Sequence, residues 1–213
     1  KINIMKLLEN LKWRYATKKF DSSKNISDAD LERLKEAIQL SVSSYGLQLY
    51  KVLVIKDRKL REQLKEAFWN QAQITDASHL FIFCNYTERS EKHIDEYIQA
   101  TAKIQGSPLD KLSAYGDFIK GSLSQKTDSE WISWSEKQTY LALSNLLMAC
   151  AELKIDACPM EGFESDKYNE ILGLKKKGLN AAVIAPVGFR SEEDHTQFRK
   201  KVRKPKEVLF ELV

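Results

Sequence analysis

The sequence predicts one globular domain, residues 1–213, that combines α-helices with β-strands. Strand-like and helical patterns alternate between residues 50 and 86. A largely apolar run at 129–153 predicts a long helix that is buried on most sides, either at the centre of the molecule or against a second subunit. With 43% apolar and 10% aromatic residues, the chain can fill a large core.

Each element in the first third of the chain has its own signal. Apolar residues at helical spacing predict a helix over residues 5–15. A second helix begins after Ser27, a favourable N-cap, and ends in the loop SVSSYG at 41–46. The β-branched segment YKVLVIKD at 50–57 predicts a strand, and a charged helix follows over 58–69.

The later elements are predicted from the same kinds of sequence pattern. A buried strand is expected at 79–86, and residues 87–127 read as polar helices interrupted by glycines, which makes them the candidate lid. After the long apolar helix, a short helix is introduced by Ser165, and a buried strand is expected at 180–189. The final run EVLFELV at 207–213 is strand-like, and it could pair with its own sheet or with a partner chain.

Composition narrows the functional classes. Lysine and arginine exceed aspartate and glutamate by 34 − 30 = 4, too small an excess for a dedicated nucleic-acid binder. No apolar run approaches the length of about 20 residues that a membrane span needs. Cys84, Cys150 and Cys158 are an odd number without CxxC spacing, which indicates neither a disulfide framework nor a zinc site. We therefore expect a cytoplasmic protein without a metal, a nucleic-acid partner or a membrane anchor.

Two common phosphate-binding motifs are absent. Gly116 and Gly121 have the spacing of a P-loop, but Ser122 and Leu123 follow where a lysine and a hydroxyl residue are required. No GxGxxG segment occurs in the chain. A phosphate would therefore have to be held by side chains.

Two basic clusters offer such side chains. Arg14 and Lys18 lie in RYATKKF near one end of the chain, and Lys201 and Arg203 lie in RKKVRKP near the other. Planar arginine forks together with lysine point charges suit a phosphate group. The alternative is that both clusters are ordinary solvated surface.

Three loop elements carry further binding chemistry. The hydroxyls of SVSS and the following Gly46 could approach a polar ligand, although such a segment also ends helices. Asn70 and Gln73 offer amide groups on one side of a helix end, and would equally suit a C-cap. Glu161-Gly162 follows a proline closely, and a glycine there lets backbone N–H groups approach a flat ligand, although an ordinary turn explains it as well.

Seven segments in order along the chain resemble the flavin-dependent nitroreductase family, in particular its oxygen-insensitive NAD(P)H nitroreductase and dihydropteridine reductase-like branch. They are LKWRYATKKFD, SVSSYGLQLY, FWNQAQITDASH, EWISWSEKQTYLALSN, CPMEGF, VIAPVGF and KVRKP. The resemblance implies an α+β, nitroreductase-like fold with a central, mostly antiparallel sheet flanked by helices. It also implies an intertwined homodimer with one FMN at each of two subunit interfaces.

The resemblance assigns a role to most of the polar elements. It implies that the FMN phosphate is held by Arg14, Lys201 and Arg203, with help from the backbone of Tyr15 and Ala16. Lys18 would lie near flavin N1 and O2, where it would stabilise the negative charge of the reduced ring.

The other site residues follow in the same way. The resemblance implies that the partner subunit donates the loop residues Val42, Ser43, Ser44 and Gly46. The pyrimidine side of the ring would meet Asn70 and Gln73, and flavin N5 and O4 would meet the backbone of Glu161 and Gly162. The walls for the nicotinamide and the acceptor would be Tyr45, Trp69 and Phe118.

The chain departs from the branch at four positions. Members of the branch often have serine at Ala16, proline at Val42, asparagine at Gly46 and lysine at Gln73. Since Gln73 removes a positive charge near the ring, we expect a lower flavin potential than in two-lysine enzymes.

The implied activity is that of an FMN-dependent oxidoreductase. NADH or NADPH would pass a hydride to flavin N5 and leave, and a nitroaromatic, a quinone or a pterin would then take the hydride in a ping-pong cycle. Two alternatives stay open at this point. One is another flavin enzyme of the same fold, such as a flavin reductase, and the other is a basic binding module without enzymatic activity.

Overall fold

A central antiparallel sheet organises the chain. The structure is a computed structural model that describes residues 2–213, and within them the sheet has four strands in the order β1-β2-β4-β3. Their bounds are Tyr50–Ile55 for β1, His79–Tyr86 for β2, Asp156–Ala157 for β3 and Leu179–Gly188 for β4. All three strand pairings are antiparallel, which confirms the predicted sheet and its three longer strands.

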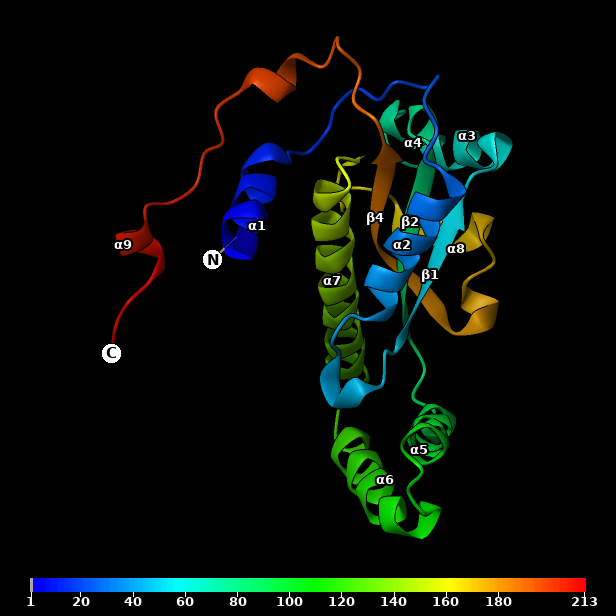
Figure 1. The fold of residues 1–213 in the computed structure, drawn as a ribbon. Helices are drawn as coiled ribbons and strands as arrows, with labels where there is room; N and C mark the ends of the chain where they lie inside the picture. The colour runs from blue at the N-terminus through cyan, green and yellow to red at the C-terminus, as the bar shows by residue number, and fades with distance from the viewer. Residues whose placement is uncertain (1) are drawn as a thin grey trace.

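Helices cover both faces of the sheet (Figure 1). Side chains of β2 alternate between two buried clusters, with Leu80 and Ile82 in one and Phe81 and Phe83 in the other. The first cluster lies beneath α3 (Arg58–Glu66), α4 (Gln73–Asp76) and α8 (Ser165–Ile171). The second lies beneath α2 (Asp28–Gln39) and α7 (Asp128–Glu152). The expected long helix is therefore α7, and it covers one face of the sheet.

The predicted lid is a pair of helices. Figure 1 shows α5 (Glu91–Gln105) and α6 (Leu109–Ser124) beyond one end of the sheet. Gly106 ends α5 in the left-handed conformation, as expected of an interrupting glycine. Gly116 and Gly121 lie inside α6, so the prediction that they interrupt the helix is wrong. A Cβ at Gly116 would come within 3.1 Å of Ile98, so a glycine there lets the two helices approach closely.

Two helix ends differ from the prediction for a visible reason. The first helix, α1, spans Ile2–Trp13 rather than 5–15, because the chain turns away at Tyr15 toward Asp194. The helix predicted over 58–69 ends at Glu66, because Trp69 and Asn70 adopt left-handed φ angles of 48° and 52°. None of the described helices is both long and apolar enough to cross a membrane.

The expected strand at 207–213 does not form within this chain. Pro205 caps a short helix, α9 (Lys206–Leu209), and the residues after it belong to no sheet. Figure 1 shows this segment far from the sheet, on the same side as α1. Among residues 2–213, no strand lies beside this segment to supply backbone hydrogen bonds, and Phe210, Leu212 and Val213 are exposed.

Candidate active site

The two basic clusters of the sequence line one cleft. The end of α1 and the segment that follows the short helix η3 (His195–Phe198) enclose a hollow of about 490 Å³. Predicted residues that line it are Arg14, Tyr15, Ala16, Lys18, Lys201 and Arg203, together with Lys12, Arg199 and Lys200. The Lys201 ammonium donates hydrogen bonds to the carbonyls of Leu11 and Arg14, so it also caps the end of α1.

Arg14, Lys18, Lys201 and Arg203, hereafter the cationic cluster, line this cleft together. Across residues 6–213, none of the four forms an ion pair with a carboxylate. Burial and the nearby Arg203 lower the pKa of Arg14. Burial, Arg14 and Arg203 likewise lower the pKa of Lys201. The cleft therefore concentrates like charges that an anion would stabilise.

A buried carboxylate that we did not predict stands behind the cluster. Asp194 is 3% exposed, and its Oδ2 accepts hydrogen bonds from the Tyr15 hydroxyl at 2.9 Å, from Lys18 N at 2.8 Å and from Lys19 N at 3.2 Å. Its Oδ1 accepts from Thr196 N at 3.0 Å. Burial opposes ionisation of Asp194, but these hydrogen bonds outweigh it and lower its pKa to about 2. Asp194 thus ties the first basic segment to the last one.

A second buried carboxylate, Asp156, helps to position Trp13 and Tyr15, which line the cleft. Asp156 accepts hydrogen bonds from the backbone N–H and the Nε of Arg190, both at 2.9 Å. The Arg190 guanidinium also lies over two aromatic rings, 4.3 Å from the centre of Trp13 and 4.6 Å from that of Tyr15. The ring of Tyr15 is therefore fixed on one side while its hydroxyl reaches Asp194.

A less charged hollow adjoins the cationic cleft. It has a volume of about 450 Å³, and it shares Pro159 with the cleft. Its other lining residues are Tyr140, Leu143, Ser144, Leu147, Glu161 and Val183. Burial, together with the neighbouring Glu161 carboxylate, raises the pKa of Tyr140 to about 12. One end of the combined site is thus cationic and the other is mainly apolar.

Gly162 meets an aromatic side chain, which sequence reasoning did not anticipate. A Cβ on Gly162 would lie 3.1 Å from the Trp69 indole and 3.4 Å from Phe68. Trp69 is 72% exposed, and Asn70 beside it is exposed too. Gln73 begins α4 and is buried, so it does not cap the preceding helix. The structure therefore brings Trp69 and Gly162 together, and separates Gln73 from solvent.

The loop from Val42 to Gly46 lies elsewhere in the chain. Ser44 N donates to Gln138 on α7, and the Tyr45 hydroxyl lies 3.0 Å from Ser122 on α6. The Tyr45 ring also meets Phe118 edge-on, with 6.5 Å between centroids. Arg14 is instead near Cys150 on α7, twelve positions beyond Gln138 and so roughly 18 Å along the helix. Within one chain, the loop does not reach the cationic cleft.

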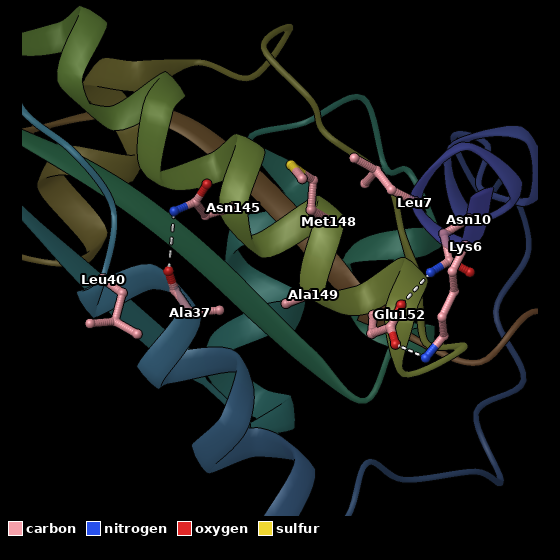
Figure 2. A pocket seen from close by; sticks show the side chains of 9 residues that line it. All are labelled: Lys6, Leu7, Asn10, Ala37, Leu40, Asn145, Met148, Ala149 and Glu152. Carbon is pink, nitrogen blue, oxygen red and sulfur yellow. Dashed lines mark hydrogen bonds and ion pairs between the residues drawn. The ribbon is translucent and has the colours of Figure 1, made fainter. Parts of the chain in front are cut away.

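A third hollow contains none of the predicted residues. Figure 2 shows it between α1, α2 and α7, with a volume of about 520 Å³. Leu7, Leu40 and Met148 line it, and Glu152 pairs with Lys6 at one end. It presents exposed apolar side chains but no group of convergent charges.

Comparison with known proteins gives the class of the molecule. A model described as the nitroreductase family matches residues 11–189. A Bacillus subtilis protein with the provisional name NAD(P)H nitroreductase YfkO is 34% identical over 207 residues, which cover 92% of this chain and 94% of that protein. The chain belongs to the nitroreductase family and is an oxidoreductase. The alternative of a basic module without enzymatic activity is therefore wrong.

Solved structures share the fold. YdfN from Bacillus subtilis, provisionally named a nitroreductase, has a TM-score of 0.89 at 16% identity and covers 99% of this chain and 100% of its own. A provisionally named nitroreductase of Exiguobacterium sibiricum, solved in complex with FMN, has a TM-score of 0.84 at 21% identity and covers 97% of each chain. The predicted nitroreductase-like α+β fold is confirmed.

Proposed function

We propose that this chain is an FMN-dependent NAD(P)H oxidoreductase. The observation that supports this proposal is the cationic cluster, which converges next to an apolar hollow across Pro159 and forms no ion pair with a carboxylate of residues 6–213. FMN has the matching shape, with a phosphate at one end and a flat ring at the other. The provisional names of the relatives and the FMN complex of a structural neighbour support the same cofactor and co-substrate.

The residues of the two hollows take distinct roles in this proposal. Arg14, Lys201 and Arg203 hold the phosphate, with the backbone of Tyr15 and Ala16 beside it. Lys18 stabilises negative charge on the pyrimidine side of the ring, where Asn70 also binds. The backbone of Glu161, which lines the less charged hollow, and of the adjacent Gly162 faces the ring.

FMN supplies hydride transfer between the nicotinamide and an electron-poor acceptor, and the protein supplies position and charge. The exposed indole of Trp69, which lies against Gly162, offers a flat apolar wall for either substrate. Nitroaromatics, quinones and pterins are the proposed acceptors, and either NADH or NADPH is the donor.

We also propose that the active unit is a homodimer. Apolar side chains are exposed on α1 at Leu8, on α7 at Leu141 and on the terminal segment at Phe210. Covering such surfaces stabilises an obligate dimer. The Val42–Gly46 loop contacts Gln138, roughly 18 Å along α7 from Cys150 and the Arg14 side of the helix, so a partner chain is the source of this loop in the proposed site. The three cysteines are free and buried, which suits a cytoplasmic enzyme.

The test is a spectrum followed by an assay. The purified protein should absorb at about 450 nm, as flavoproteins do. Oxidation of NADH and of NADPH should then be followed with four acceptors, namely a nitroaromatic, a quinone, a pterin and free flavin. Turnover of one of the first three supports the proposal. Turnover of free flavin alone would instead make the protein a flavin reductase, and a colourless protein that cannot be loaded with FMN would rule out both.

A further inference from the structure

Asp194 occupies an unusual position for a carboxylate. It lies directly behind the cationic cluster, it is 3% exposed, and it bonds the protein's own backbone rather than any lysine or arginine side chain. Two consecutive N–H groups, from Lys18 and Lys19, point at one of its oxygens. A pair of N–H groups arranged in this way is an anion-binding nest, and here the nest is filled by the chain itself.

We propose that Asp194 is a positioning residue that shapes the phosphate end of the cleft. Its carboxylate holds the Tyr15–Lys19 turn against η3, from which the chain continues to Lys201 and Arg203. Asp194 therefore helps to fix the two halves of the cationic cluster relative to each other, alongside the bonds from Lys201 to the carbonyls of Leu11 and Arg14. This inference rests on the proposed function, because it assumes that the cluster binds the FMN phosphate.

The negative charge of Asp194 allows a positioning role to be distinguished from a purely electrostatic one. Asp194 is negative, and FMN brings a further negative charge to the same cleft. If Asp194 were only a nearby charge, neutralising it would strengthen phosphate binding. If it positions the cluster, neutralising it weakens phosphate binding. An asparagine has one neutral acceptor oxygen and an NH2 group in place of the two carboxylate oxygens, so the N–H and O–H donors around Asp194 keep fewer and weaker acceptors.

Other bonds keep the two segments together when the carboxylate is changed. Ser191 N donates to the carbonyl of Lys19 at 2.9 Å, and Asp21 N donates to the carbonyl of Phe189 at 2.8 Å. These backbone bonds do not involve Asp194. The variant Asp194→Asn is therefore expected to fold, with the relaxation confined to the turn and the cleft.

The experiment compares FMN with riboflavin, which has the same ring but no phosphate. Each flavin is titrated into apoprotein, and the dissociation constant is read from the quenching of flavin fluorescence at constant ionic strength. For Asp194→Asn we expect FMN affinity to fall by about tenfold or more, while riboflavin affinity stays within about twofold. Tyr15→Phe, which removes one donor, should show a smaller loss of the same kind.

Glu193→Gln is the matched control. Glu193 is the preceding residue and carries the same charge, but it is exposed and pairs with the Lys19 side chain. Its neutralisation should leave FMN affinity unchanged or slightly higher.

Three outcomes would overturn the inference. FMN binding to Asp194→Asn that is unchanged or tighter would make Asp194 a spectator charge. An equal loss for FMN and riboflavin would make it a general packing residue. A wild-type protein that binds FMN no better than riboflavin would show that the cluster does not bind the phosphate, which would overturn the inference together with the proposed phosphate site.

Discussion

The two ends of the candidate active site are built in different ways. At the phosphate end, a few buried polar groups join segments that are far apart in the sequence, such as Tyr15 and Asp194. At the proposed ring end, next to Glu161 of the less charged hollow, the exposed indole of Trp69 lies against Gly162. The phosphate end therefore depends on individual residues, whereas the ring end should tolerate change.

The largest effect is expected at the cationic cluster. Arg14→Ala should weaken FMN binding by about 100-fold, because a charged hydrogen-bond donor to the phosphate is lost. Lys18→Ala should weaken binding less and mainly slow NAD(P)H oxidation. Fluorescence titration and steady-state rates measure the two effects. Arg33→Ala is the control, since Arg33 is an exposed arginine on α2 outside the cleft. Equal losses for Arg14→Ala and Arg33→Ala would contradict a localised phosphate site.

The next effect concerns stability and its dependence on pH. The pKa of Asp194 is lowered to about 2 in the folded chain, so its ionised form stabilises the fold above the ordinary pKa of an aspartate, about 4. That contribution, about 2 kcal/mol, is lost as the pH falls from about 4 to about 2. Urea denaturation should therefore show a free-energy difference between wild type and Asp194→Asn at pH 7 that shrinks toward pH 2. A difference that stays constant with pH would contradict the lowered pKa.

Features with a local sequence pattern could be predicted, whereas features that depend on contacts between distant residues could not. The strands at 50–57, 79–86 and 180–189 were foreseeable because their apolar and β-branched residues fill both faces of the sheet. The composition of residues 207–213 is that of a strand, and it could not reveal that no neighbouring strand of the chain lies beside them. Similarly, β3 and α4 are too short to leave a periodic signal.

The site shows the same division. The cationic residues were visible as clusters, and the structure brings them into one cleft. Asp194 was missed because it belongs to the acidic run EED, which resembles solvated surface in the sequence. The contact of Trp69 with Gly162 was missed because packing between distant residues has no local signal.

A smaller effect is expected in the loop before β1. Gly46 has a φ of 74°, and a Cβ there would lie 3.0 Å from the Tyr97 hydroxyl. Gly46→Ala should therefore lower the free energy of unfolding by roughly 1 kcal/mol. Gly46→Asn should cost less in backbone strain, because asparagine tolerates this conformation, but it meets the same hydroxyl. In denaturation experiments, Tyr97→Phe should recover part of the loss in Gly46→Ala, and no recovery would place the strain in the backbone alone.

The smallest effect is expected where the ring end meets Gly162. A Cβ at Gly162 would come within 3.1 Å of the Trp69 indole, but that side chain is 72% exposed and can move by a few tenths of an ångström. Gly162→Ala should thus change the free energy of unfolding by no more than about 0.5 kcal/mol. It should still alter the emission of Trp69, isolated by subtracting the spectra of the matching Trp69→Phe proteins. Gly121→Ala is the control, because it lies in α6 with open space around it and should leave that emission unchanged. A loss of several kcal/mol in Gly162→Ala would show that the indole is held as firmly as Asp194, and the contrast between the two ends would disappear.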